Sequence, residues 1–107
     1  MTRVVVNPGI CGKSVTAEVV KVGKRRVGIK ITTDCEIVTK MGESLAELDQ
    51  RDILKPHVHS EVYKCASRCH LHAACPVPMA IIKAVEVEGG LALPRPVSIH
   101  FETLEQE

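Results

Sequence analysis

Two alternating segments joined by a short polar turn constrain the fold of this 107-residue chain more than any other feature. Residues 14–22 alternate apolar and polar side chains, and residues 27–32 repeat the alternation after a turn that contains Gly23. This pattern is typical of strands with one buried face, and it predicts an antiparallel hairpin. The inward-facing positions are Val15, Ala17, Val19, Val27, Ile29 and Ile31. The basic tip, residues 24–26, is either a solvated turn or a docking patch for an acidic partner.

Two further strands are expected at the ends of the chain. Residues 4–6 are a run of valines, and residues 97–101 alternate, with Phe101 and His100 on opposite faces. A chain of this length is expected to form one domain, residues 1–107, around its own core. The expected fold class is α+β, an antiparallel sheet of three or four strands with helices packed on one face.

Capping signals predict the helices. Asp34 is expected to cap a helix that Gly42 ends, and Ser44-Leu45-Ala46-Glu47 has the form of a capping box for a short helix through Leu48. Ser60 is expected to cap another short helix. Cys75 is in the N-cap position of a longer helix with Pro76 as its first residue, and this helix stops at Gly89-Gly90.

Composition excludes several classes of function. The net charge is +1, and Tyr63 and Phe101 are the aromatic residues, so neither a basic surface nor stacking platforms favour nucleic-acid binding. No apolar run approaches the length of a membrane span, and the first residues lack the pattern of a secretory signal. A cytoplasmic protein is therefore expected. In a reducing cytosol its five cysteines are free thiols or metal ligands.

The stretch 69–78 concentrates soft ligands at the start of the longer helix. Cys69, His70, His72 and Cys75 lie within seven residues, and such density is usual in a zinc site or a redox thiol centre. A thiol at a helix N-terminus faces unpaired amides, which favours the thiolate. The alternative is that Cys75 is a small buried hydrophobic residue.

Other cysteines flank the hairpin. Cys11, followed by Gly12, precedes it, and Cys35 follows it at the start of a helix. Because a hairpin returns the chain to where it started, these two thiols are expected to lie close together. Cys65 and Cys69 are four residues apart on a helix, so they are either a pair of ligands or redox thiols, or two residues of the core.

The residues resemble a known family at this point. Cys11-Gly12 before a hairpin, Asp34-Cys35 opening a helix, and Cys75 before Ala80-Ile81-Ile82-Lys83-Ala84 are similar to the iron–sulfur cluster scaffold proteins of the NifU/IscU type. Further matches are Gly42-Glu43-Ser44-Leu45 and Asp52-Ile53, so that the resemblance extends from Cys11 to about Ala84. The whole string from Asn7-Pro8-Gly9 to Gly90-Leu91-Ala92-Leu93-Pro94 is most similar to a family of short uncharacterised prokaryotic proteins.

The scaffold resemblance implies a SufE/NifU-like sandwich that holds a nascent cluster on Cys11, Cys35 and Cys75 and exchanges sulfur with a donor or acceptor protein. The chain departs from that family at two positions. Lys13 stands where the scaffolds have aspartate, and Ala74 rather than a histidine directly precedes Cys75. His72, three residues before Cys75, is the expected nitrogen ligand.

Three functions are compatible with these residues. The first is a zinc or iron–sulfur module of scaffold or carrier type, with Cys11, Cys35, Cys75 and His72 as ligands and Cys69 and His70 as further candidates. The second is a sulfur acceptor or redox protein in which Cys75 is the nucleophile, His72 or His70 the base, and Cys69 or Cys65 the resolving thiol. The third is a non-catalytic interaction domain with buried cysteines. The chain lacks the phosphate-loop, dinucleotide and nucleophile-elbow motifs, so a binding module is expected rather than an enzyme, and a homo-oligomer is compatible with it.

Overall fold

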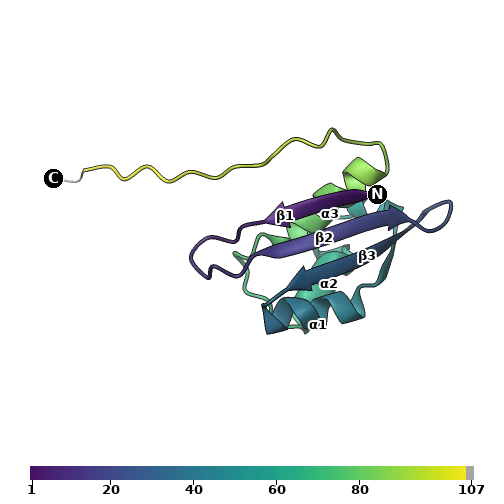
Figure 1. The fold of residues 1–107 in the computed structure, drawn as a ribbon, viewed down its shortest axis with the longest axis horizontal. Helices are drawn as coiled ribbons and strands as arrows, with labels where there is room; N and C mark the ends of the chain where they lie inside the picture. The colour runs from purple at the N-terminus through teal and green to yellow at the C-terminus, as the bar shows by residue number, and fades with distance from the viewer. Residues whose placement is uncertain (106–107) are drawn as a thin grey trace.

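The computed structural model describes residues 1–105, which form a two-layer α+β sandwich (Figure 1). One layer is a four-stranded antiparallel sheet in the order β1-β2-β3-β4, and the other contains the helices. The strands are β1 (Thr2–Val6), β2 (Val15–Lys21), β3 (Arg26–Thr33) and β4 (Glu47–Asp49). The helices are α1 (Glu36–Ser44), α2 (Glu61–Arg68) and α3 (Val77–Glu88), together with the short 3₁₀ segments η1 (Gln50–Leu54) and η2 (His57–His59). This architecture confirms the expected fold class.

The predicted hairpin is present as β2 and β3. Its register pairs Val15 with Thr33 and Val19 with Ile29, and β1 adds on the other side of β2 with Val6 opposite Val15. The predicted inward positions of the hairpin face the helices, where all but the partly buried Ile31 are buried. Alternation identified the buried face correctly because side chains on a strand point to opposite faces with a period of two.

The helices cover one face of the sheet. The longest, α3, packs against β1 and β2, while α1 packs against β3 and α2 contacts both other helices. The core between the layers is built mainly from aliphatic side chains. Its largest fully buried members are Met41, Ile81, Val15, Val19, Val27, Val38, Val62, Val77 and Val85.

The prediction that residues 97–101 form the last strand is wrong. After Gly90 the chain leaves the body as an extended tail in which Ile99 is 72% and Phe101 94% exposed. The fourth strand is β4, which pairs with the start of β3, from Arg26 opposite Asp49 to Gly28 opposite Glu47. Alternation identifies the face that a strand can bury, but it contains no information about which sheet edge is within reach.

The expected short helix from Ser44 through Leu48 is also wrong. Helix α1 continues past Gly42 to Ser44, and the following residues extend along β3, where the Ile29 N–H donates to the Ala46 carbonyl at 2.8 Å. Leu45 and Leu48 are both buried in this extended path. Pairing with the open edge of β3 therefore prevails over the local capping signal.

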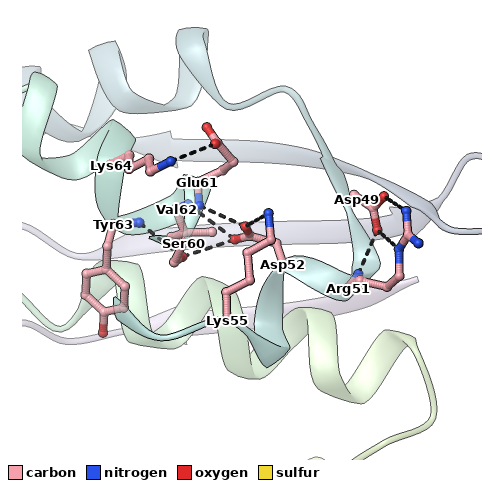
Figure 2. Close-up of polar contacts among 9 residues, drawn as sticks. All are labelled: Asp49, Arg51, Asp52, Lys55, Ser60, Glu61, Val62, Tyr63 and Lys64. Atoms are coloured by element: carbon pink, nitrogen blue, oxygen red, sulfur yellow. Dashed lines mark hydrogen bonds and ion pairs between the residues drawn. The ribbon is translucent and has the colours of Figure 1, made fainter. Parts of the chain in front are cut away.

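Helix α2 begins where Ser60 was expected to cap it, and a buried carboxylate reinforces the cap (Figure 2). The Ser60 hydroxyl accepts a hydrogen bond from the Tyr63 N–H at 3.3 Å. Asp52, 1% exposed, accepts from the Ser60 hydroxyl at 3.1 Å and from the Glu61 N–H at 2.8 Å, and pairs with the Lys55 ammonium at 3.6 Å. An anionic group here satisfies helix donors that are otherwise unpaired. Asp52 thus fastens η1 to the start of α2.

Truncating α3 at its most buried contact tests the packing of the two layers. Ile81 is fully buried, so Ile81→Ala is expected to lower the free energy of unfolding by about 2–5 kcal/mol through lost burial and a cavity. Chemical denaturation followed by circular dichroism measures this. Val58→Ala is the control, because Val58 is 74% exposed and its truncation is expected to change stability by less than about 0.5 kcal/mol. Equal effects of the two substitutions would contradict the assignment of α3 to the core.

Removing the buried carboxylate tests the second anchor. Asp52→Ala is expected to cost about 1–3 kcal/mol of stability, because it leaves the buried Ser60 hydroxyl and the Glu61 N–H without their acceptor. Asp34→Ala, at an exposed carboxylate, is the matched control and is expected to be nearly neutral. Denaturation midpoints that are the same for both variants would show that Asp52 does not stabilise the fold.

Candidate thiol site

Strand register brings the segments that carry Cys11 and Cys35 to the same end of the sheet. Val6, Val15 and Thr33 are neighbours across β1, β2 and β3, so residues 7–14 and the exit from β3 start side by side. The Thr33 hydroxyl joins the two segments, since it donates to the Ser14 carbonyl at 3.0 Å and accepts from the Cys35 N–H at 3.1 Å. The expected proximity of the two cysteine segments follows from this register.

The direction of α3 brings Cys75 to the same end. At the last turn of α3 the Glu88 carboxylate accepts hydrogen bonds from the Thr2 hydroxyl at 2.7 Å and from the Lys21 N–H at 3.2 Å. This fixes the C-terminus of α3 beside the start of β1. The N-terminus of α3, and Cys75 before it, consequently lie at the other end, toward the loop that follows β1 (Figure 1).

The thiol of Cys75 is partly buried and its pKa lies above the ordinary value. Burial is the main cause, because it disfavours the charged thiolate. The Val77 N–H donates toward the sulfur and acts in the opposite direction, whereas negative charge on Cys35 and Cys11 raises the pKa further. The expectation that the helix N-terminus makes this thiol a ready thiolate is therefore wrong. Cys35 and Cys11 both influence the pKa of Cys75, which agrees with the strand register that brings their segments to this end of the sheet.

Local geometry at both helix starts differs from the expected caps. Pro76, rather than Cys75, is the N-cap of α3, which begins at Val77. At α1 the N-cap is Cys35, without a side-chain cap, while Asp34 is exposed. Cys35 is thus the N-cap of α1, whereas Cys75 lies one residue before the N-cap of α3.

Cys11 is on the least constrained of the three segments. It is exposed, as is the neighbouring Ile10, and it lies between Gly9 and Gly12, which have φ values of +87° and +70°. The Gly12 N–H closes this turn on the Gly9 carbonyl at 2.9 Å. Glycine adopts these positive φ values without steric cost, so the turn places an exposed thiol at the end of the sheet.

The histidines expected as ligands are exposed. The His72 carbonyl accepts a hydrogen bond from the Cys75 N–H at 3.1 Å, which keeps the two residues in one turn. His70 has a φ of +60° at the end of α2. Within residues 1–105, no three side chains of histidine, cysteine, aspartate or glutamate converge closely enough to hold a metal ion. The expected four-ligand set is therefore not preassembled.

Cys65 and Cys69 belong to the core side of α2. Cys65 is fully buried, its thiol donates to the Met41 carbonyl at 3.6 Å, and its pKa is raised by burial and by the neighbouring Cys69. Cys69 is partly buried against the same core. Of the two alternatives for this pair, the one in which they are core residues agrees with the burial of Cys65.

Sequence reasoning missed two residues that organise this site, Thr33 and Glu88. Neither residue is part of a motif that would predict its partner. Both roles depend on contacts between segments distant in sequence, as between Thr2 and Glu88, so no local pattern identifies them.

Thiol reactivity tests the different environments of the cysteines. At pH 7 iodoacetamide is expected to modify exposed Cys11 about tenfold or more faster than Cys75, because burial and a raised pKa both lower the amount of reactive thiolate at Cys75. The rate at Cys75 is expected to rise as the pH increases above 9, and Cys65 is expected to react only after unfolding. Mass spectrometry of the individual peptides measures these rates. Faster modification of Cys75 than of Cys11 at pH 7 would contradict the raised pKa.

In residues 1–105, no helix combines the length and the apolar character needed to cross a membrane.

Comparison with known proteins identifies a family but no activity. A search of curated proteins and a search of solved structures found no match. The model of a family of unknown function (DUF6951) matches residues 2–101, which include all three segments of the thiol site. The chain therefore belongs to this family of unknown function, DUF6951.

Proposed function

We propose that this protein is a small metal-binding module of scaffold or carrier type, in which Cys11, Cys35 and Cys75 hold a zinc ion or an iron–sulfur cluster. One observation carries the proposal. Three cysteines from segments far apart in sequence gather at one end of the sandwich, and the pKa of Cys75 responds to charge on both of the others. Cys11 is exposed and Cys35 and Cys75 are only partly buried, so these three are not simply buried core residues.

The chemistry of the donor set supports a soft metal. Three thiolates close together repel one another, and a cation that binds all of them compensates this charge. Metal binding therefore displaces the protons that the free thiols carry. Thiolate sulfur favours zinc or iron–sulfur clusters over magnesium or calcium. His72, in the same turn as Cys75, is the candidate for a fourth ligand, followed by Cys69 and His70.

Metal binding in this proposal requires the 7–14 loop to close. Cys35 and Cys75 are tied to the starts of two helices, whereas Cys11 is on an exposed turn with glycines on both sides. Binding free energy therefore orders this loop, as is common where a site is completed by its metal. An exposed thiol at the edge of the site also gives a sulfur donor or acceptor protein access to it.

The likeness to NifU/IscU-type scaffolds supports the same proposal, because the order of the three cysteines along the chain is that of the scaffolds. Lys13 is a difference with a physical consequence. A cation next to Cys11 stabilises a bound anionic centre, while the scaffold aspartate does the opposite. Tighter retention than in a scaffold with aspartate is the expected result.

The raised pKa of Cys75 argues against the second function, a sulfur acceptor or redox protein that uses Cys75 as its nucleophile. A nucleophilic cysteine is ordinarily activated by a lowered pKa or an adjacent base. Among the charged neighbours of Cys75, the thiols of Cys35 and Cys11 increase its pKa rather than lower it.

Metal analysis of anaerobically purified protein tests the proposal. We expect close to one zinc per chain, or iron with acid-labile sulfide and visible absorption. Cys35→Ser and Cys75→Ser are expected to lower the metal content at least about tenfold, because each removes one of three strong ligands. Cys65→Ala is the matched control and is expected to retain the metal, since its thiol is buried against Met41.

Circular dichroism of each variant separates loss of a ligand from loss of the fold. Wild-type protein that is free of metal after purification and does not bind added zinc or reconstituted iron and sulfide would overturn the proposal. Equal loss of metal in Cys65→Ala, with the fold intact, would show that the ligand set is different.

A further inference from the structure

The sheet has an open edge at β1. Strand β4 covers the outer edge of β3, but in the described residues β1 pairs only with β2. Val4 points toward the core and is only partly buried, and Val5 on the other face is 69% exposed. An open edge of this kind presents unpaired N–H and carbonyl groups that accept another strand.

The tail contains a segment with the composition of such a strand. Residues 97–101 alternate apolar Val97, Ile99 and Phe101 with polar Ser98 and His100, as a half-buried strand does. All five residues are exposed. Exposed apolar side chains continue along the tail, namely Leu91, Leu93, Val97, Ile99, Phe101 and Leu104. A series of this length indicates a surface that becomes covered.

Residues 97–101 do not reach β1 of their own chain if the tail continues in the direction in which it leaves, because the connection before them is too long. The tail begins beside the start of β1, where Glu88 contacts Thr2, and it runs in the direction of β1 (Figure 1). Residues 91–96 contain Pro94 and Pro96, and at ~3.1 Å per residue they span roughly 19 Å. The five residues of β1 span only roughly 17 Å. Val97 is therefore reached after β1 has ended.

We propose that residues 97–101 pair with β1 of a second copy of this chain, so that two copies exchange tails in a symmetric dimer. A two-fold axis perpendicular to the strands reverses β1 of the second copy relative to the first. A tail that runs in the direction of its own β1 is then antiparallel to the β1 that it meets. Each copy supplies one tail and one open edge, so the contact is closed and limited to two chains.

The match between the two segments specifies a register. Both contain five residues, and pairing of Ile99 with Val4 sets Val97 opposite Val6 and Phe101 opposite Thr2. Residues opposite one another share a face, so the three apolar tail residues cover the partly buried inner side of β1. Ser98 and His100 then lie on the solvent face, next to exposed Val5 and Arg3.

The test compares two substitutions on opposite faces of the tail segment. Sedimentation velocity of the full chain across a concentration series is expected to show a dimer for wild type, and Ile99→Asp is expected to raise the dimer dissociation constant at least about tenfold. Ser98→Asp is the matched control, with the same charge on the solvent face, and is expected to remain dimeric. Both positions are exposed on the tail, so neither substitution removes a core contact.

Hydrogen exchange identifies the contact. Residues 2–6 and 97–101 are expected to be protected together in wild type and unprotected in Ile99→Asp. A monomer at all concentrations would overturn the proposal, whether the tail is exchanging freely or is protected by folding back on its own chain. A dimer that Ile99→Asp leaves unchanged would overturn it as well. The outcome does not depend on metal content, because the variants do not alter a cysteine.

Discussion

The packing of α3 across β1 and β2 is the interaction on which the rest of the structure depends. Ile81 and Val85 on α3 are fully buried where this helix packs against β1 and β2. The hydrogen bonds from Thr2 and Lys21 to Glu88 then determine which end of the helix lies at which end of the sheet. Burial of apolar area supplies the free energy, whereas the polar contacts select the orientation. With α3 so placed, the residues before its first turn lie beside the loop between β1 and β2.

Two opposing electrostatic effects meet at the thiol end. The first turn of α3 offers an N–H to the sulfur of Cys75, which favours a thiolate, but burial and two neighbouring thiols disfavour it more strongly. The net result is a Cys75 thiol whose pKa lies above its ordinary value. A bound soft cation reverses this balance, because it takes the place of the protons and compensates the charge. The raised pKa of Cys75 is unfavourable for a nucleophile and is compatible with the proposed role as a metal ligand.

The open edge of β1 and the detached tail complement each other. Within residues 1–105, the edge of β1 has no partner strand and the alternating segment 97–101 has no sheet, while the short β4 is the edge strand on the other side. Two prolines hold the connection extended, so the tail extends beyond β1 of its own chain.

The thiol site is at one end of the β2–β3 hairpin and the basic residues 24–26 are at the other, so the two ends of the sandwich are chemically distinct.

The sequence by itself determined the elements whose signals are local. The β2–β3 hairpin follows from alternation, the start of α2 from the Ser60 cap, and the end of α3 from Gly89-Gly90. Only the tertiary structure decided which segment became the fourth strand, why residues 97–101 are exposed, and that the pKa of Cys75 is raised. Caps and periodicity depend on neighbours within about four residues. Strand pairing, desolvation and the meeting of three thiols depend on segments that only the folded chain brings together.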